Sequence, residues 1–487
     1  MRQKLSDALN EIRASFITEA AHAKAKKKPY WLSVVAAILV IVLLLQLGKL
    51  PMTVHATAVS LVPDCRTVER PDLDDYETWE AWRADLDIWE AQRDAKEAAV
   101  TQAAVSLAPF FREGSQLILG DSDSRNLVWS PINAYIGLAM AAELTAGESR
   151  QQILDLFGVG DLEALRNQVS SIWEQINQDN GNEICVLANS LWLEEGLVYN
   201  QDTMDNLAYH YYASVYEGDL GSKKINKAIS AWLNNNTGGL LKDSADSIDL
   251  AEETILALYS TIYFQSKWSD QFSASKNTHE PFHSPDGDIT CTFMNQDLMQ
   301  TNYYWGEDFG AVSLWLKNGS RMWFFLPDED KTAADVLAGN QYLQLITDPY
   351  SYGETNGKYM KVNLSVPKFD VSSNANIRSG LEAMGVTDVF DPGAADFSAT
   401  LSGMPVWLTA ANQATRVIID EEGVKAAAYI EFPGAGAAQP PDEPFPPQAL
   451  GRKMPACDRV DNRDAPWPTL TVSLPLMVML TLPLGDK

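Results

Sequence analysis

The chain has 487 residues, of which 46% are hydrophobic, so it can form one large domain with appendages or two to three average domains. Its 37 basic and 65 acidic residues give a net charge of −28, which argues against a nucleic acid partner and indicates an acidic, soluble surface. The four cysteines lie far apart and lack CxxC spacing, so we expect buried free thiols and neither a disulfide scaffold nor a zinc site: Cys65, Cys185, Cys291 and Cys457.

The N-terminal segment has the pattern of a membrane anchor. Residues 31–45, "WLSVVAAILVIVLLL", carry no charge, and with their neighbours they approach the roughly 20 residues that span a bilayer. Four lysines lie within residues 24–28, just before this stretch, whereas Lys49 alone follows closely. The positive-inside rule then predicts a cytosolic segment 1–28, a transmembrane helix 29–48 and an extracellular remainder, which makes a single-pass cell-membrane protein with a signal-anchor. The alternative is a signal peptide cleaved near "ATA" at 56–58, which would give a secreted protein.

An acidic spacer, residues 49–98, follows the anchor. Large apolar residues recur in it every three or four positions, which predicts one stripe of an amphipathic helix: Leu73, Tyr76, Trp79, Trp82, Leu86 and Trp89. We expect this stripe to dock on the chain's own domain.

From residue 99 onward, helical patterns precede strand patterns. "NLVWSPINAYIGLAMAAEL" predicts a short strand and then a helix that starts at Ser-Pro, and "ESRQQILDLFGV" predicts a second helix ending at Gly158. Later segments are rich in β-branched and aromatic residues and predict strands: "ETILALYSTIYFQSKW", "MWFFLPDED" and "KVNLSVPKFDV". This order predicts an α+β fold with large β-sheets.

Several of these segments, in the same order, resemble the serpin family. They are "NLVWSPINAYIGLAM", "ESRQQILDLFGV", "INKAISAWLNNNTGGLLKD", "LYSTIYFQSKWSDQF" and "VPKFDVSSNANIRSGLEAMGVTDVFDPGAADFSA". The resemblance covers roughly residues 99–438 and implies a multi-helix serpin-like domain at 99–451 with an exposed reactive-centre loop, followed by an atypical segment at 452–487. It also implies a protease inhibitor that is not itself an enzyme, needs no cofactor or metal, and acts as a monomer on a target protease.

In a serpin, the stretch 421–445 would hold the hinge and the reactive loop, and a protease that cuts the loop would be trapped when the loop enters the sheet. The hinge would be "EEGVKAAA": Glu421, Glu422, Gly423, Val424, Lys425, Ala426, Ala427 and Ala428. Val424, Ala426, Ala428, Ile430 and Phe432 alternate, so one face of the added strand would enter the core. Without the resemblance, this stretch would be interpreted as a flexible linker.

Counting seventeen residues from Glu421 places the reactive bond at Ala437-Ala438. The small residues around this bond favour an elastase-like target. The resemblance assigns control of sheet opening to Ser130, Pro131, Asn133 and Gln413. Asn133, Gln413 and Ser260 depart from the serine, histidine and asparagine that are usual in the family.

A noninhibitory serpin fold, used as a membrane-tethered binding or structural module, is the alternative function. Pro433 lies in the segment that would insert and lacks an N–H for the sheet, so insertion would stop early. At the C-terminus the family's hydrophobic strand pair has no clear equivalent, and Pro475 would break or confine any strand within 469–482. A hydrolase or metalloenzyme is disfavoured because none of the five histidines lies in a GxSxG or HExxH context.

Overall fold

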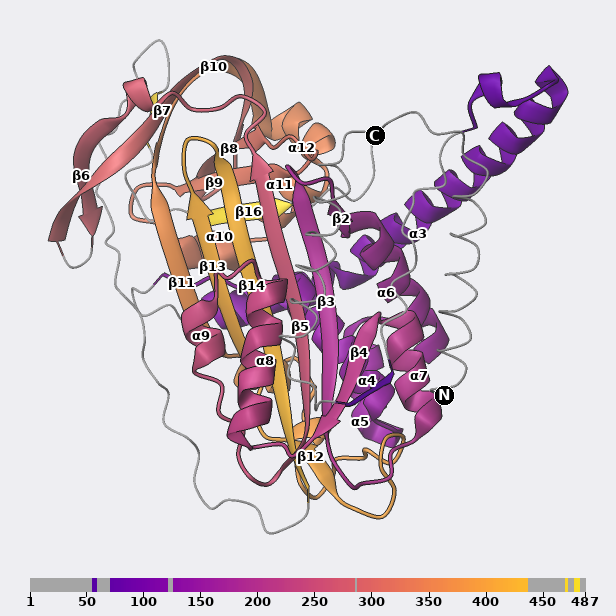
Figure 1. Ribbon diagram of the computed structural model, residues 1–487. Coiled ribbons are helices and arrows are strands. Elements are labelled where there is room, and N and C mark those ends of the chain that lie inside the picture. The colour runs from indigo at the N-terminus through magenta and orange to yellow at the C-terminus, as the bar shows by residue number, and fades with distance from the viewer. Residues whose placement is uncertain are drawn as a thin grey trace, which may run out of the picture. The chain divides into compact units, whose positions relative to one another are not determined.

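The computed structural model of the chain describes residues 55–58, 71–120, 126–284, 287–436, 469–471 and 477–481. Within these ranges, two large sheets are packed with helices (Figure 1). The helices are α3 Trp79–Leu119, α4 Pro131–Leu144, α5 Gly147–Leu156, α6 Leu162–Ile176, α7 Gln201–His210, α8 Lys223–Asn236, α9 Lys242–Asp246, α10 Ala333–Ala338, α11 Gln341–Thr347, α12 Pro349–Asn356 and α13 Arg378–Ala383. The strands are β1 His55–Ala58, β2 Gln178–Asp179, β3 Ile184–Glu194, β4 Ala213–Gly218, β5 Thr254–Lys267, β6 Thr278–Ser284, β7 Gly287–Trp305, β8 Phe309–Trp315, β9 Arg321–Pro327, β10 Gly357–Pro367, β11 Phe369–Asn376, β12 Val406–Leu408, β13 Asn412–Ile419, β14 Gly423–Gly436, β15 Thr469–Thr471 and β16 Met477–Thr481.

The first sheet contains the segment that the sequence assigns to the hinge and loop. Its strand order in the described residues is β1-β4-β3-β5-β14-β13-β11, with β2 added to β3 and β12 added to β14. All of these pairs are antiparallel except β3 with β4. In Figure 1, α8 and α9 lie in front of this sheet. Strand β14 therefore lies inside a sheet and not at its edge.

The second sheet has the order β15-β10-β7-β8-β9-β16, with β6 added to β7. Residues 469–471 pair in parallel with β10, and residues 477–481 pair antiparallel with β9. The tail thus supplies two short strands at opposite edges of this sheet, one on each side of Pro475 in the sequence. They do not pair with each other as a hairpin.

Helix α4 is buried on all sides, as its largely apolar sequence predicts. It begins with Pro131 in the first turn, where a missing N–H costs nothing, and every residue from Asn133 to Leu144 is buried. It packs against β5 and β14 of the first sheet. Helix α5 ends just before Gly158, whose positive φ of 63° suits a glycine at a helix end.

The short strand predicted before α4 is not present. Residues 126–130 have no strand pairing, because side chains take up their backbone groups. The Val128 amide donates to Ser373 Oγ at 3.1 Å, and the Val128 carbonyl accepts a bond from Thr415 Oγ1 at 3.0 Å. This segment is therefore tied to the sheet by side-chain hydrogen bonds instead of a backbone ladder.

The aromatic stripe of the spacer does not dock as one surface. Leu86 is buried at 2% exposure, but Trp79 is 58% exposed and Leu73 is 47% exposed. Trp82 lies against its own N-terminal neighbours, because its Nε1 donates to the Pro71 carbonyl at 3.0 Å and its ring lies 4.7 Å from that of Trp79. The prediction of docking is wrong for the first residues of the stripe. The later part of α3, which includes Leu107 and Phe110, does enter the core.

Candidate functional site

The hinge segment continues directly into β14, which fills a position between β5 and β13. Gly423 to Ala435 pair with β5, from Lys267 to Thr254, and residues 424–431 pair with β13. In Figure 1, β14 runs between these two strands along most of the sheet. In this structure, the stretch predicted to be an exposed loop is an inserted strand as far as Gly436.

One face of β14 lies in the core, as the alternation predicts. Val424, Ala428, Ile430 and Phe432 are exposed by 3% or less, and Ala426 is half-buried against the same cluster. On the opposite face Lys425 is exposed, but Ala427 and Tyr429 are buried at 3% and 5% exposure, so the expectation that this face meets the solvent is wrong beyond Lys425. Helix α4 packs behind this part of the strand. The loop segment therefore carries the residues of a central strand, with large side chains in its second half.

Pro433 does not stop the strand, contrary to the sequence-based expectation. It pairs opposite Ala257 of β5, and β14 continues for three more residues. On the other side, β13 pairs only as far as Glu431 and β12 pairs only from Gly434. Pro433 lies at the gap between these two partners, where its carbonyl accepts a 2.8 Å bond from the Thr409 amide. A missing N–H is tolerated on this side because neither ladder passes through this position.

Glu431 is the acidic residue of the inserted strand. Its two carboxyl oxygens accept bonds from the Tyr259 hydroxyl at 2.7 Å and from Asn412 Nδ2 at 3.2 Å, one on each neighbouring strand. Burial raises the pKa of this carboxyl, and the two hydrogen bonds only partly oppose that effect. Among the described residues, no lysine, arginine or histidine forms an ion pair with it.

The turn that enters β14 is closely fitted. The Asp420 carboxylate accepts bonds from the amides of Glu422 at 2.8 Å and Gly423 at 3.1 Å. Trp268, at the end of β5, donates its Nε1 to the Asp420 carbonyl at 2.8 Å and its amide to the Glu422 carbonyl at 3.0 Å. A Cβ at Gly423 would overlap the Ser266 carbonyl of the neighbouring strand, so only glycine fits there.

Glu421 connects the hinge to the rest of the domain. Its carboxylate accepts a 2.6 Å charged bond from Lys368 Nζ and a 2.5 Å bond from Asn277 Nδ2. The Lys368 ammonium is the main reason that the pKa of Glu421 lies below its usual value. Lys368 and Asn277 were not found from the sequence.

The residues assigned to sheet opening lie together between α4 and the sheet. Gln413 of β13 forms two bonds with the backbone of Ser130, accepting from its amide and donating to its carbonyl, both at 2.9 Å. Asn133 Nδ2 donates to Ser260 Oγ of β5 at 3.0 Å in a fully buried contact. Pro131 begins α4 beside them. These contacts link α4 to the two strands that flank β14.

Two other predicted features lie outside the described residues. The reactive bond Ala437-Ala438 follows β14 immediately, and the anchor 29–48 precedes the first described strand. In the part of the chain that the structure describes, no helix has the length and apolar character needed to span a membrane.

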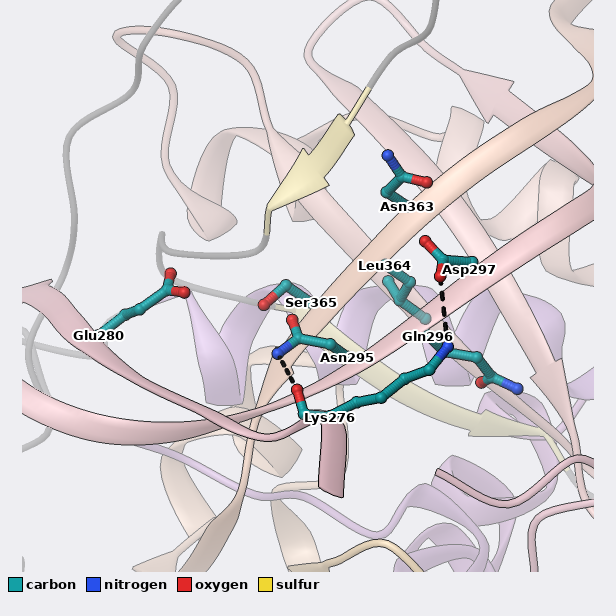
Figure 2. A pocket seen from close by; sticks show the side chains of 8 residues that line it. All are labelled: Lys276, Glu280, Asn295, Gln296, Asp297, Asn363, Leu364 and Ser365. Atoms are coloured by element: carbon teal, nitrogen blue, oxygen red, sulfur yellow. Dashed lines mark hydrogen bonds and ion pairs between the residues drawn. The ribbon is translucent and has the colours of Figure 1, made fainter. Parts of the chain in front are cut away.

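A polar pocket of about 200 Å³ lies on the second sheet (Figure 2). It is lined by Lys276, Glu280, Asn295, Gln296, Asp297, Asn363, Leu364 and Ser365. Its Lys276 and Asp297 form an ion pair at 3.3 Å. Mixed charge and small size give this pocket no clear ligand preference.

The inserted strand, its hinge and the flanking sheet can be compared with known families. A family model described as "Serpin (serine protease inhibitor)" matches residues 114–446. The chain belongs to the serpin family. This match includes α4, the hinge and all of β14.

Relatives and solved structures agree with this assignment. The chain is 24% identical to "Alpha-1-antiproteinase" of Callosciurus caniceps over 366 residues, covering 72% of this chain and 85% of that protein. It is also 26% identical to "Plasminogen activator inhibitor 1" of Neovison vison over 340 residues, covering 67% of this chain and 83% of that protein. The fold is similar to cleaved kallistatin complexed with heparin, with a TM-score of 0.62 at 19% identity, covering 69% of this chain and 99% of that one. It is also similar to the serpin tengpin in the latent state, with a TM-score of 0.59 at 22% identity, covering 67% and 88%.

Proposed function

We propose that this serpin inhibits serine proteases by loop insertion. A protease would cut near Ala437-Ala438 and form an acyl-enzyme, and the segment that ends at Gly436 would then enter the sheet with the protease attached. The observation that supports this is the pairing of residues 423–435 with β5 on one side and of 424–431 with β13 and 434–436 with β12 on the other, with four core-facing side chains almost fully buried. The inserted segment gains a ladder of hydrogen bonds on its β5 side and buries apolar surface, which favours insertion after cleavage.

The proposed target accepts small residues. Ala435, Gly436 and Ala437 carry neither a basic group for an acidic specificity pocket nor a large ring for a deep apolar one. An elastase-like enzyme is therefore the proposed partner. We propose further that residues 29–48 anchor the inhibitor in the cell membrane as a single span, with the domain outside the cell.

The test is formation of a covalent complex. The extracellular portion is mixed with an elastase-like protease, and an SDS-stable complex is expected. Val424→Arg places a charge on the core face of β14, where Val424 is 1% exposed, so it should abolish the complex while cleavage continues. Lys425→Arg, on the exposed face, is the matched control and should form the complex normally. Clean cleavage of the wild type without a complex would overturn the proposal.

One observation favours the noninhibitory alternative. The chain is continuous here, yet β14 already occupies the position between its neighbours. A molecule in this state has no sheet position left to fill, so cutting it would release no conformational energy. If intact and cleaved protein unfold at the same temperature and no complex forms, a noninhibitory, membrane-tethered binding or structural module becomes the better assignment.

A further inference from the structure

Gly137, on the face of α4 that packs against β14, has an unusually close relationship with the inserted strand. A Cβ atom at this position would lie 2.8 Å from Ile430 Cγ2 and 2.8 Å from Phe432 Cε2. Separations below 3.0 Å are essentially never found around real Cβ atoms, so an alanine here would force one of the partners to move.

Neither partner has room to move. Ile430 and Phe432 are both 0% exposed and belong to the main core cluster. Interiors are packed at crystal-like density, and an extra methyl group is accommodated only through strained rotamers or backbone shifts. The clash would therefore be absorbed by displacement of β14 itself.

The clash is specific to the inserted strand. The next nearest atom to the added Cβ is Phe432 Cδ2 at 3.5 Å, so every atom outside these two side chains and the neighbouring turns of α4 lies at ordinary contact distance or beyond. In the absence of β14, a methyl group at position 137 would fit the surroundings seen here. Among the residues from other elements that the added Cβ would meet, only those in the second half of β14 require the absence of a side chain at this helix position.

We propose that Gly137 is a positioning residue for loop insertion, which admits the large side chains of Ile430 and Phe432 beneath the sheet. This inference rests on the proposed insertion mechanism and extends it by naming a size match between helix and loop. It also accounts for large residues at positions 430 and 432, where the first half of β14 has Ala426 and Ala428.

The proposal predicts effects of opposite sign in the two forms of the protein. Inside a helix, alanine is intrinsically more favourable than glycine because glycine loses more backbone entropy on folding. Gly137→Ala should therefore raise the unfolding temperature of the form whose loop is outside the sheet, and lower that of the form containing β14. A residue with a purely structural role in α4 would shift both forms in the same direction.

The experiment compares thermal unfolding of loop-cleaved protein with that of uncut protein whose loop a protease can still cut, because this accessibility identifies the form with the loop outside the sheet. With Gly137→Ala, the cleaved protein should unfold at least several degrees below the cleaved wild type. If β14 no longer enters the sheet, the cleaved variant should have the same unfolding temperature as the uncut variant. Gly160→Ala is the matched control, because no heavy atom lies within 4 Å of a Cβ there, and it should leave the cleaved form unchanged.

A double-mutant cycle assigns the effect to the two partners. In the background Ile430→Ala with Phe432→Ala, the destabilisation by Gly137→Ala should disappear because the clashing atoms are gone. An unchanged or higher unfolding temperature of cleaved Gly137→Ala, or an equal loss in both backgrounds, would overturn the inference. Failure of the wild type to trap a protease would instead count against the proposed function alone, because the cycle is read from unfolding and not from inhibition.

Discussion

Glu431 and Tyr259 form a 2.7 Å hydrogen bond between β14 and β5, and the carboxyl group in this bond has a raised pKa because it is buried. A raised pKa means that the Glu431 carboxyl group binds a proton more tightly in the inserted form than it does in water. The inserted form therefore gains stability as the pH falls through the raised pKa toward the usual value of about 4.3, and loses it as the pH rises.

We expect Glu431→Gln to remove this dependence. The variant should unfold at a higher temperature than the wild type near neutral pH, and the difference should shrink as the pH approaches about 4. The neighbouring tyrosines, Tyr259 and Tyr429, do not complicate the comparison, because burial raises their pKa and they stay neutral. Thermal unfolding of the loop-inserted form between about pH 4 and 8 gives the measurement. A difference that does not vary with pH would contradict the prediction.

The buried bond between Asn133 and Ser260 should be sensitive to loss of either partner. Asn133→Ala or Ser260→Ala leaves a buried polar group unpaired, and each should lower the free energy of unfolding by about 1–3 kcal/mol. The exchange Asn133→Ser with Ser260→Asn restores one donor and one acceptor across the same gap. Denaturant unfolding should show that the exchanged protein recovers most of the loss. If Asn133→Ser and Ser260→Asn lower the free energy of unfolding additively when combined, the bond does not couple α4 to β5.

The ion pair of Glu421 with Lys368 should respond to salt and acid. The Lys368 side chain is 38% exposed, so Lys368→Ala should cost only about 0.2–1 kcal/mol, and less at high salt. Because the pKa of Glu421 is lowered, its contribution is present above the usual glutamate value and is lost as the pH falls through the lowered pKa. Unfolding titrations of wild type and Lys368→Ala at two salt concentrations test this. A loss that grows with salt would contradict it.

Membrane topology is tested on whole cells. The lysines before residue 29 predict a cytosolic N-terminus, so externally added protease should release the large domain from intact cells. Moving the four lysines to the other side of the hydrophobic stretch is the control and should reverse the result. Protection of the domain in the unaltered protein would refute the orientation.

The strands with the most regular patterns were predictable from the sequence, and the contacts across the hinge were not. Their content of β-branched and aromatic residues identified β5, β9 and β10, because this signal is local to the chain. The core face of β14 followed from alternation only after the serpin resemblance marked the segment as a strand. The inserted position of β14 depends on two other strands, and no local pattern shows whether they leave a place for it. Lys368, Asn277 and Trp268 contact the hinge from 53, 144 and 152 residues away, so only the fold brings them together. The expectation that Pro433 would stop the strand was wrong for a related reason. Whether its missing N–H matters depends on where the ladders to β13 and β12 end.

The turn between β13 and β14 spans only residues 420–422, so these two strands can pair early, as a hairpin does, within microseconds. Pairing of β14 with β5 instead closes a chain segment of about 150 residues, and such long-range contacts form slowly. We therefore expect β14 to pair with β13 before it pairs with β5. The order in which β14 pairs with β13 and with β5 decides whether a newly folded molecule has a free loop or already contains β14 as an inserted strand.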